Sequence, residues 1–176
     1  VDFVIEAVPE KMAIKQAVFA ELDAVTPGHA ILSSNTSGLS ISEMAEATIR
    51  PEKVCGFHFF YPASVMPLVE VIYGDETASE TIQVASNFAQ AIGKQPITCG
   101  EVPGFVVNRI LNSAVGEIWR QQEEQGLSIQ KIDEGVGAAN VSLLVPLLLP
   151  RPPRLHTLFP FTSLLRAAYG DSFYVH

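Results

Sequence analysis

Short apolar runs alternate with helix-period segments over the first hundred residues, and this alternation limits what the chain can fold into. Runs of this length that are nearly continuously apolar are typical of buried strands. They cover residues 1–8, 30–33, 54–60, 68–72 and 96–99. Strands that alternate with helices predict βαβ units and a mostly parallel sheet, so the expected fold class is α/β.

The segments between these runs predict helices. They cover residues 9–26, 42–48 and 77–92. In the first of them, Ile14, Val18, Phe19 and Leu22 recur at helical spacing, and we expect them to face the core.

The pattern changes near residue 101. A long helix is predicted over 105–125, and a second helix follows over 128–135. We therefore assign residues 1–101 to an α/β domain and 102–142 to the start of a helical domain.

The last segment, residues 143–176, is irregular: from residue 143 to about 165 it shows neither period, and its prolines interrupt any helix. It is either a divergent loop or a frameshifted interval. We favour the frameshift, because about 20 structureless residues are unusual in a compact domain.

Composition excludes several function classes. The net charge of −8 argues against a nucleic-acid partner, which requires a basic surface. No apolar run reaches the ~18 residues of a membrane-spanning helix, so no membrane partner is expected. Cys55 and Cys99 show no metal-ligand spacing and make no disulfide framework, which favours a reducing compartment: the cytoplasm or an organelle matrix.

A polar loop at residues 34–37 follows the second expected strand. Small hydroxyl and amide residues are common turn formers, so an ordinary turn is one interpretation. The other is a ligand site, because open α/β sheets bind ligands at the carboxyl ends of their strands.

His58 and Glu70 interrupt two neighbouring apolar runs. A buried carboxylate needs a partner, and His58 is the nearest candidate for Glu70. Such a pair fixes the imidazole tautomer and stabilises the imidazolium, as a general base requires. The alternatives are a structural histidine and an edge strand with Glu70 facing water.

Asn108 lies near the start of the long predicted helix, beside Arg109. Its amide can donate or accept a hydrogen bond, so it could bind a substrate oxygen. A solvated helix face is the alternative.

In this order, the segments resemble the L-3-hydroxyacyl-CoA dehydrogenase family over about residues 1–142. The matching stretches are 4–10, 34–37, 56–60, 68–72 and 103–109. The intervals agree too, with 21 residues from Ser37 to His58, 12 from His58 to Glu70 and 50 from His58 to Asn108.

The resemblance implies a Rossmann-type NAD-binding domain followed by a helical domain. It also implies NAD-dependent oxidation of L-3-hydroxyacyl-CoA to 3-ketoacyl-CoA in fatty-acid β-oxidation, by a parent enzyme that is a homodimer. His58 would be the general base and Glu70 would orient it. Ser37 and Asn108 would hydrogen-bond the substrate oxygen.

Cofactor contacts are implied in the same way. Ser37 would lie near the nicotinamide, and Ala7, Glu10, Lys15 and Asn35 match the other positions expected to contact NAD.

Two departures from the family pattern bear on activity. The glycine-rich strand–turn–helix that binds the pyrophosphate is expected upstream of Val1, so we expect the chain to be an internal piece that binds NAD weakly. Tyr61 stands where the family usually has Asn. An inactive fragment or pseudoenzyme that serves in assembly is therefore the alternative function, and another 3-hydroxy acid is the alternative substrate.

Overall fold

The computed structural model describes residues 1–128, 131–132, 135, 163 and 165–170 of the chain. The chain divides into two compact units, Val1–Phe105 and Val106–His176. The boundary expected from the sequence lies between residues 101 and 102, and in the structure the second unit begins four residues later, at Val106.

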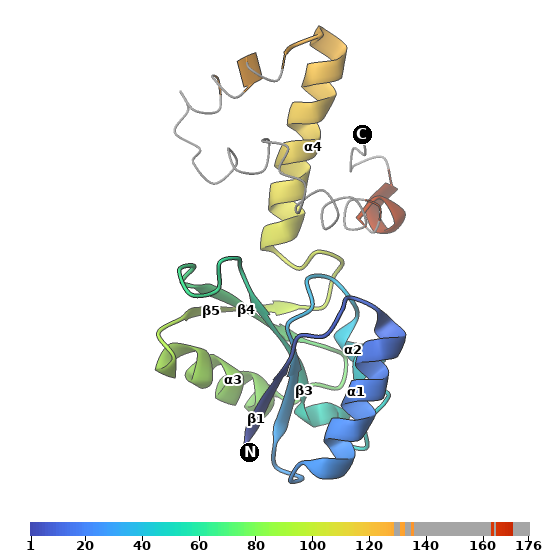
Figure 1. Ribbon diagram of the computed structural model, residues 1–176, viewed down its shortest axis with the longest axis vertical. Coiled ribbons are helices and arrows are strands. Elements are labelled where there is room, and N and C mark those ends of the chain that lie inside the picture. Colours follow the sequence, from blue (N-terminus) through green and yellow to red (C-terminus); the bar gives the residue numbers. More distant parts are fainter. Residues whose placement is uncertain (129–130, 133–134, 136–162, 164, 171–176) are drawn as a thin grey trace. The chain divides into compact units, whose positions relative to one another are not determined.

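The first unit is built on a five-stranded sheet in the order β1-β2-β3-β4-β5 (Figure 1). Its strands are β1 Phe3–Glu6, β2 Ile31–Ser34, β3 Val54–Phe59, β4 Leu68–Tyr73 and β5 Gln95–Gly100. The α/β class and the five expected strands are confirmed. The carboxyl ends of β1, β2 and β3 share one edge of the sheet, because these strands pair in parallel.

The sheet is mixed, because β4 and β5 pair in parallel with each other and run against β1–β3. The expectation of a mostly parallel sheet is thus corrected at one pairing, between β3 and β4. Eight residues, 60–67, join these two strands. Parallel neighbours need a crossover of about a dozen residues or more, so this short connection makes an antiparallel pair.

Helices cover both faces of the sheet (Figure 1). They are α1 Met12–Val25, α2 Ile41–Ala45 and α3 Ser79–Ala91, with a 3-10 turn η1 at Pro51–Lys53. On one face α1 and α2 pack through a cluster that includes Phe19, Leu32 and Met44. On the other face α3 packs through a cluster that includes Phe57 and Ala85. Successive strand residues point to opposite faces, which places His58 and Glu70 on the α1–α2 side.

The expected apolar stripe of α1 is wrong at one position. Ile14 is 39% exposed, whereas the neighbouring Lys15 is buried. The lysine can be buried because its ammonium group meets two carboxylates, Glu6 and Glu10.

The second unit contains α4 at Val107–Gln125, close to the helix expected over 105–125. Gly126 ends it in the left-handed conformation, at φ 62°. The Ser128 hydroxyl accepts a hydrogen bond from Lys131 N–H, as an N-cap does. Of the helix expected over 128–135, residues 131, 132 and 135 are helical, whereas 129–130 and 133–134 lie outside the described residues, as does most of the 143–176 segment. Within the described part of the chain, no helix has the length and apolar character that crossing a membrane requires.

Candidate active site

His58 and Glu70 form a buried pair at the centre of the sheet. They face each other in the register of β3 and β4, and His58 Nδ1 lies 2.8 Å from Glu70 Oε2. Because β4 is flanked by β3 and β5, the alternative of an exposed edge strand for Glu70 is wrong. The expected contact between the two side chains is present.

This contact defines the chemistry available to the imidazole ring. An ionised carboxylate only accepts hydrogen bonds, so Nδ1 of His58 carries the proton in the pair. Nε2 is then the atom that can take up a proton, and Glu70 stabilises the imidazolium that results.

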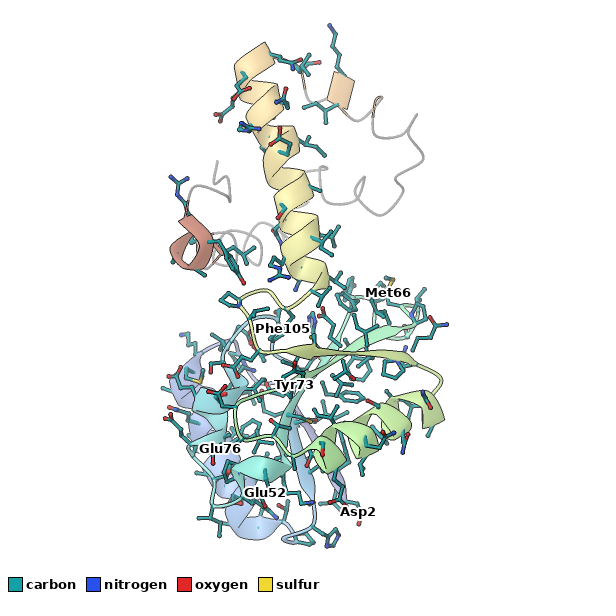
Figure 2. The ribbon with its side chains drawn as sticks, turned by 180° about the vertical axis from the view of Figure 1, so that it is seen from behind. Asp2, Glu52, Met66, Tyr73, Glu76 and Phe105 are labelled. Atoms are coloured by element: carbon teal, nitrogen blue, oxygen red, sulfur yellow. The ribbon has the colours of Figure 1, made fainter. Side chains whose placement is uncertain are left out.

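Two aromatic rings flank the imidazole of His58. The Phe60 ring centroid lies 4.8 Å from that of His58, and the Phe105 centroid lies 5.9 Å from it. Phe105, labelled in Figure 2, is fully buried. Since His58 itself is only 6% exposed, the rings and Glu70 leave little of the histidine open to water.

The polar loop after β2 is held by contacts from three directions. The Ser34 hydroxyl donates to Glu6 Oε2 (2.6 Å), and the Asn35 side-chain oxygen accepts from Phe59 N–H (2.9 Å). Glu10 Oε1 accepts from the Thr36 hydroxyl (2.5 Å) and from Ser37 N–H (2.9 Å). The loop therefore has a defined position beside the ends of β1 and β3.

The residues expected to contact the cofactor gather at this edge of the sheet. Ala7 is exposed just after β1, and the Glu10 side chain is 43% exposed. Ser37 is bonded to Glu10 through its backbone, and Asn35 to β3 through its amide. Lys15 differs, because its ammonium group lies inside and reaches the edge through Glu10, at 3.3 Å. The half-exposed Glu10 carboxylate suits a ribose hydroxyl donor, so these side chains fit a dinucleotide.

Asn108 lies in the first turn of α4, and its backbone carbonyl accepts a hydrogen bond from the Asn112 side chain. It belongs to the second unit, and its contact with a substrate stays a prediction.

Sequence reasoning missed Glu6 and Thr36. The signal for Glu6 was present, because it is a carboxylate at the end of an apolar strand, as Glu70 is within one. Glu6 faces Ser34 in the neighbouring strand and has no histidine opposite it; its partner, Lys15, comes from the following helix.

A sheet that carries a polar loop at the carboxyl ends of its parallel strands, and a buried histidine–carboxylate pair beside it, fits a Rossmann-type dehydrogenase domain. Residues 1–102 match the family model described as "3-hydroxyacyl-CoA dehydrogenase, NAD binding domain". The chain belongs to the 3-hydroxyacyl-CoA dehydrogenase family. The expected family, the Rossmann-type fold and the cofactor NAD are thereby confirmed.

Relatives agree with this assignment. The chain is 44% identical over 132 residues to 3-hydroxyadipyl-CoA dehydrogenase of Escherichia coli K12, covering 75% of this chain and 28% of the relative. It is 39% identical over 173 residues to 3-hydroxybutyryl-CoA dehydrogenase of Clostridioides difficile, covering 98% and 62%.

A solved structure is similar as well. The (S)-3-hydroxybutyryl-CoA dehydrogenase from Ralstonia eutropha matches with a TM-score of 0.83 and 33% identity, over 97% of this chain and 60% of that one. The chain thus spans less than two thirds of each of these proteins. The Clostridioides difficile alignment also extends beyond residue 142, where the family resemblance found in the sequence ends.

Proposed function

We propose that the protein formed by this chain oxidises L-3-hydroxyacyl-CoA thioesters to 3-ketoacyl-CoA with NAD⁺, the dehydrogenation step of fatty-acid β-oxidation. The observation that carries the proposal is the buried contact between His58 Nδ1 and Glu70 Oε2 at 2.8 Å. It fixes the ring so that Nε2 can act as a base, which is what removal of a hydroxyl proton requires.

In this reaction His58 Nε2 takes the proton of the substrate's 3-hydroxyl group, and the ring becomes an imidazolium. Glu70 balances that charge, and it stays ionised because the proton remains on the histidine. NAD⁺, when bound, accepts the hydride that leaves C3. The rings of Phe60 and Phe105 limit water at the imidazole, which strengthens its attraction to Glu70.

The loop and α4 supply the remaining groups of the proposal. Ser37 and Asn108 hydrogen-bond the substrate oxygen and orient it toward His58. Glu10 meets the cofactor directly, with Ala7 and Asn35 beside it. The buried Lys15 ammonium group forms an ion pair with Glu10 and orients its carboxylate.

The substrate class rests on the relatives. Their names specify 3-hydroxyadipyl-CoA and 3-hydroxybutyryl-CoA, which share a 3-hydroxyacyl group on coenzyme A. We therefore propose a CoA thioester in preference to a free 3-hydroxy acid. A homodimeric parent enzyme in a reducing compartment stays a prediction.

The test is NADH oxidation with acetoacetyl-CoA, followed by absorbance, in the native chain and in His58→Gln. We expect a loss of about 10²–10⁴-fold in kcat, the range for removal of a general acid–base group. His29→Gln is the matched control, because the exposed His29 side chain pairs with the exposed Asp2. Its activity should equal that of the native chain.

Three outcomes would contradict the proposal in whole or in part. Equal activity of His58→Gln and the native chain would remove the histidine from the mechanism. A folded chain that turns over neither acetoacetyl-CoA nor free acetoacetate would favour the alternative of a non-catalytic assembly piece. Turnover of free acetoacetate alone would support the dehydrogenase reaction and would contradict the proposal that the substrate is a CoA thioester.

A further inference from the structure

Glu6 is a buried carboxylate that the proposed reaction does not use. It is the last residue of β1, and its side chain is 1% exposed. Its Oε1 accepts from Val8 N–H (2.5 Å) and from the Lys15 ammonium (2.9 Å), and its Oε2 accepts from the Ser34 hydroxyl (2.6 Å).

Glu6 supplies one of the two carboxylates that the buried Lys15 ammonium group meets. A buried ion without a partner is strongly destabilising, so a buried lysine and a buried glutamate are retained together. Lys15 is itself 1% exposed, and its ammonium also meets the Val8 carbonyl (3.3 Å) and Glu10 Oε2 (3.3 Å). Hydrogen bonds to ionised groups are stronger than neutral ones, which favours a rigid cluster.

Two routes lead from Glu6 to the polar loop. One runs through Lys15 to Glu10, whose Oε1 accepts from the Thr36 hydroxyl and from Ser37 N–H. The other runs through the Ser34 hydroxyl, which accepts from Thr36 N–H at 3.2 Å. The first route ends at residues 36 and 37, and the second ends at Thr36.

We propose that Glu6 is a positioning residue of the active site. Through Lys15 and Ser34 it sets the places of Glu10 and Ser37, and so joins the ends of β1 and β2 to the start of α1. What Glu10 and Ser37 bind rests on the proposed function, whereas the positioning itself needs neither cofactor nor substrate.

Amide hydrogen exchange, measured residue by residue by NMR on the full chain, tests this. Glu6→Gln keeps the shape and removes the charge. Exchange at Val8, Thr36 and Ser37 should then be faster by about tenfold or more, as expected when charge-assisted hydrogen bonds are lost. Amides of β3 and β4 should keep their protection. Glu21→Gln, the same change at an exposed position of α1, should alter neither group.

Two results would overturn the proposal. Unchanged exchange at Thr36 and Ser37 would show that the loop keeps its place without the charge of Glu6. If amide exchange in β3 and β4 became faster by the same factor, Glu6 would have a role in overall stability only.

A second pair of variants covers the case in which Glu6→Gln does not fold. Glu6→Gln combined with Lys15→Met leaves no unpaired buried ion, and we expect it to fold with fast exchange at Ser37. Glu6→Asp keeps the charge, and it should retain slower exchange at Ser37 than the double variant. The exchange measurements need neither cofactor nor substrate. They therefore test the positioning role of Glu6 independently of the NADH oxidation assay, which tests the proposed function.

Discussion

Asn35 links the polar loop to the strand that carries His58: its side-chain oxygen accepts the Phe59 backbone N–H at 2.9 Å. The β2–β3 ladder ends at the pair Ser34–Gly56, so the amide of Asn35 continues the connection where backbone pairing stops. Phe59 directly follows His58 in β3. The loop and the histidine are therefore fixed relative to each other.

Asn35→Ala should loosen this connection. The loss of one partly buried hydrogen bond is expected to cost about 0.5–1.5 kcal/mol in the free energy of unfolding and to speed exchange of the Phe59 amide. Asn35→Asp is the control, because it keeps an acceptor oxygen in the same place. Equal Phe59 exchange in Asn35→Ala and the native chain would argue against the link.

Glu70→Gln should reduce turnover with little change in fold. Glutamine still offers an acceptor oxygen to His58 Nδ1, but it does not balance the charge of an imidazolium. In serine proteases the equivalent Asp-to-Asn change costs about 10⁴-fold in kcat, and we expect a loss of about 10²–10⁴-fold here. Steady-state kinetics with acetoacetyl-CoA measures it.

Glu76→Gln provides the matched comparison for Glu70→Gln. Glu76, labelled in Figure 2, is exposed in the connection after β4. The proposed roles predict native kinetics for it, and a similar loss in both variants would point to a general effect of charge.

Removal of the Arg50 side chain should lower the free energy of unfolding strongly. Arg50 directly precedes η1, and its guanidinium group contacts the C-terminal end of α1 and the residues that follow it. Its buried guanidinium pairs with Asp23 Oδ1 (2.7 Å) and donates to the Thr26 hydroxyl (2.6 Å) and the Pro27 carbonyl. Arg50→Met leaves Asp23 without its cation, and breaking a buried pair typically costs about 3–5 kcal/mol.

Urea unfolding of the two chains measures this cost. Lys53→Met, in the neighbouring η1 turn, should shift the midpoint much less, because Lys53 is only half-buried. If the urea midpoint shifted no more in Arg50→Met than in Lys53→Met, the stabilising role of the Arg50 guanidinium group would be contradicted.

Cys55 should be unreactive in the folded chain. Burial raises the pKa of its thiol from 9.0 to about 12, so the nucleophilic thiolate is scarce near neutral pH. Mass spectrometry after iodoacetamide treatment at about pH 8 should find Cys55 unmodified until urea is added. Rapid modification of Cys55 in native Cys99→Ser would contradict the prediction.

The same shift has a consequence for stability at alkaline pH. Because the folded-state pKa of Cys55 lies above the unfolded one, its contribution is complete below about pH 9 and is lost as the pH rises toward 12. Cys55→Ala should lose less stability over that interval than the native chain.

Most of the helices and strands that the structure describes could be predicted from the sequence, because period and chain breakers are local properties. The run 54–60 became β3 Val54–Phe59, and the 105–125 pattern became α4 Val107–Gln125. The pairing of His58 with Glu70 was predictable too, since a carboxylate in an apolar strand must find a partner nearby.

Tertiary structure alone decided that Lys15 lies inside. Lys15 and Ile14 are neighbours in α1, and the apolar pattern favoured Ile14 for the core. Lys15 is buried instead, because the fold brings Glu6 from the end of β1 and Glu10 from the turn before α1 to its ammonium group. Helical period records where apolar side chains recur, whereas the burial of an ion depends on counter-charges that only the folded chain assembles.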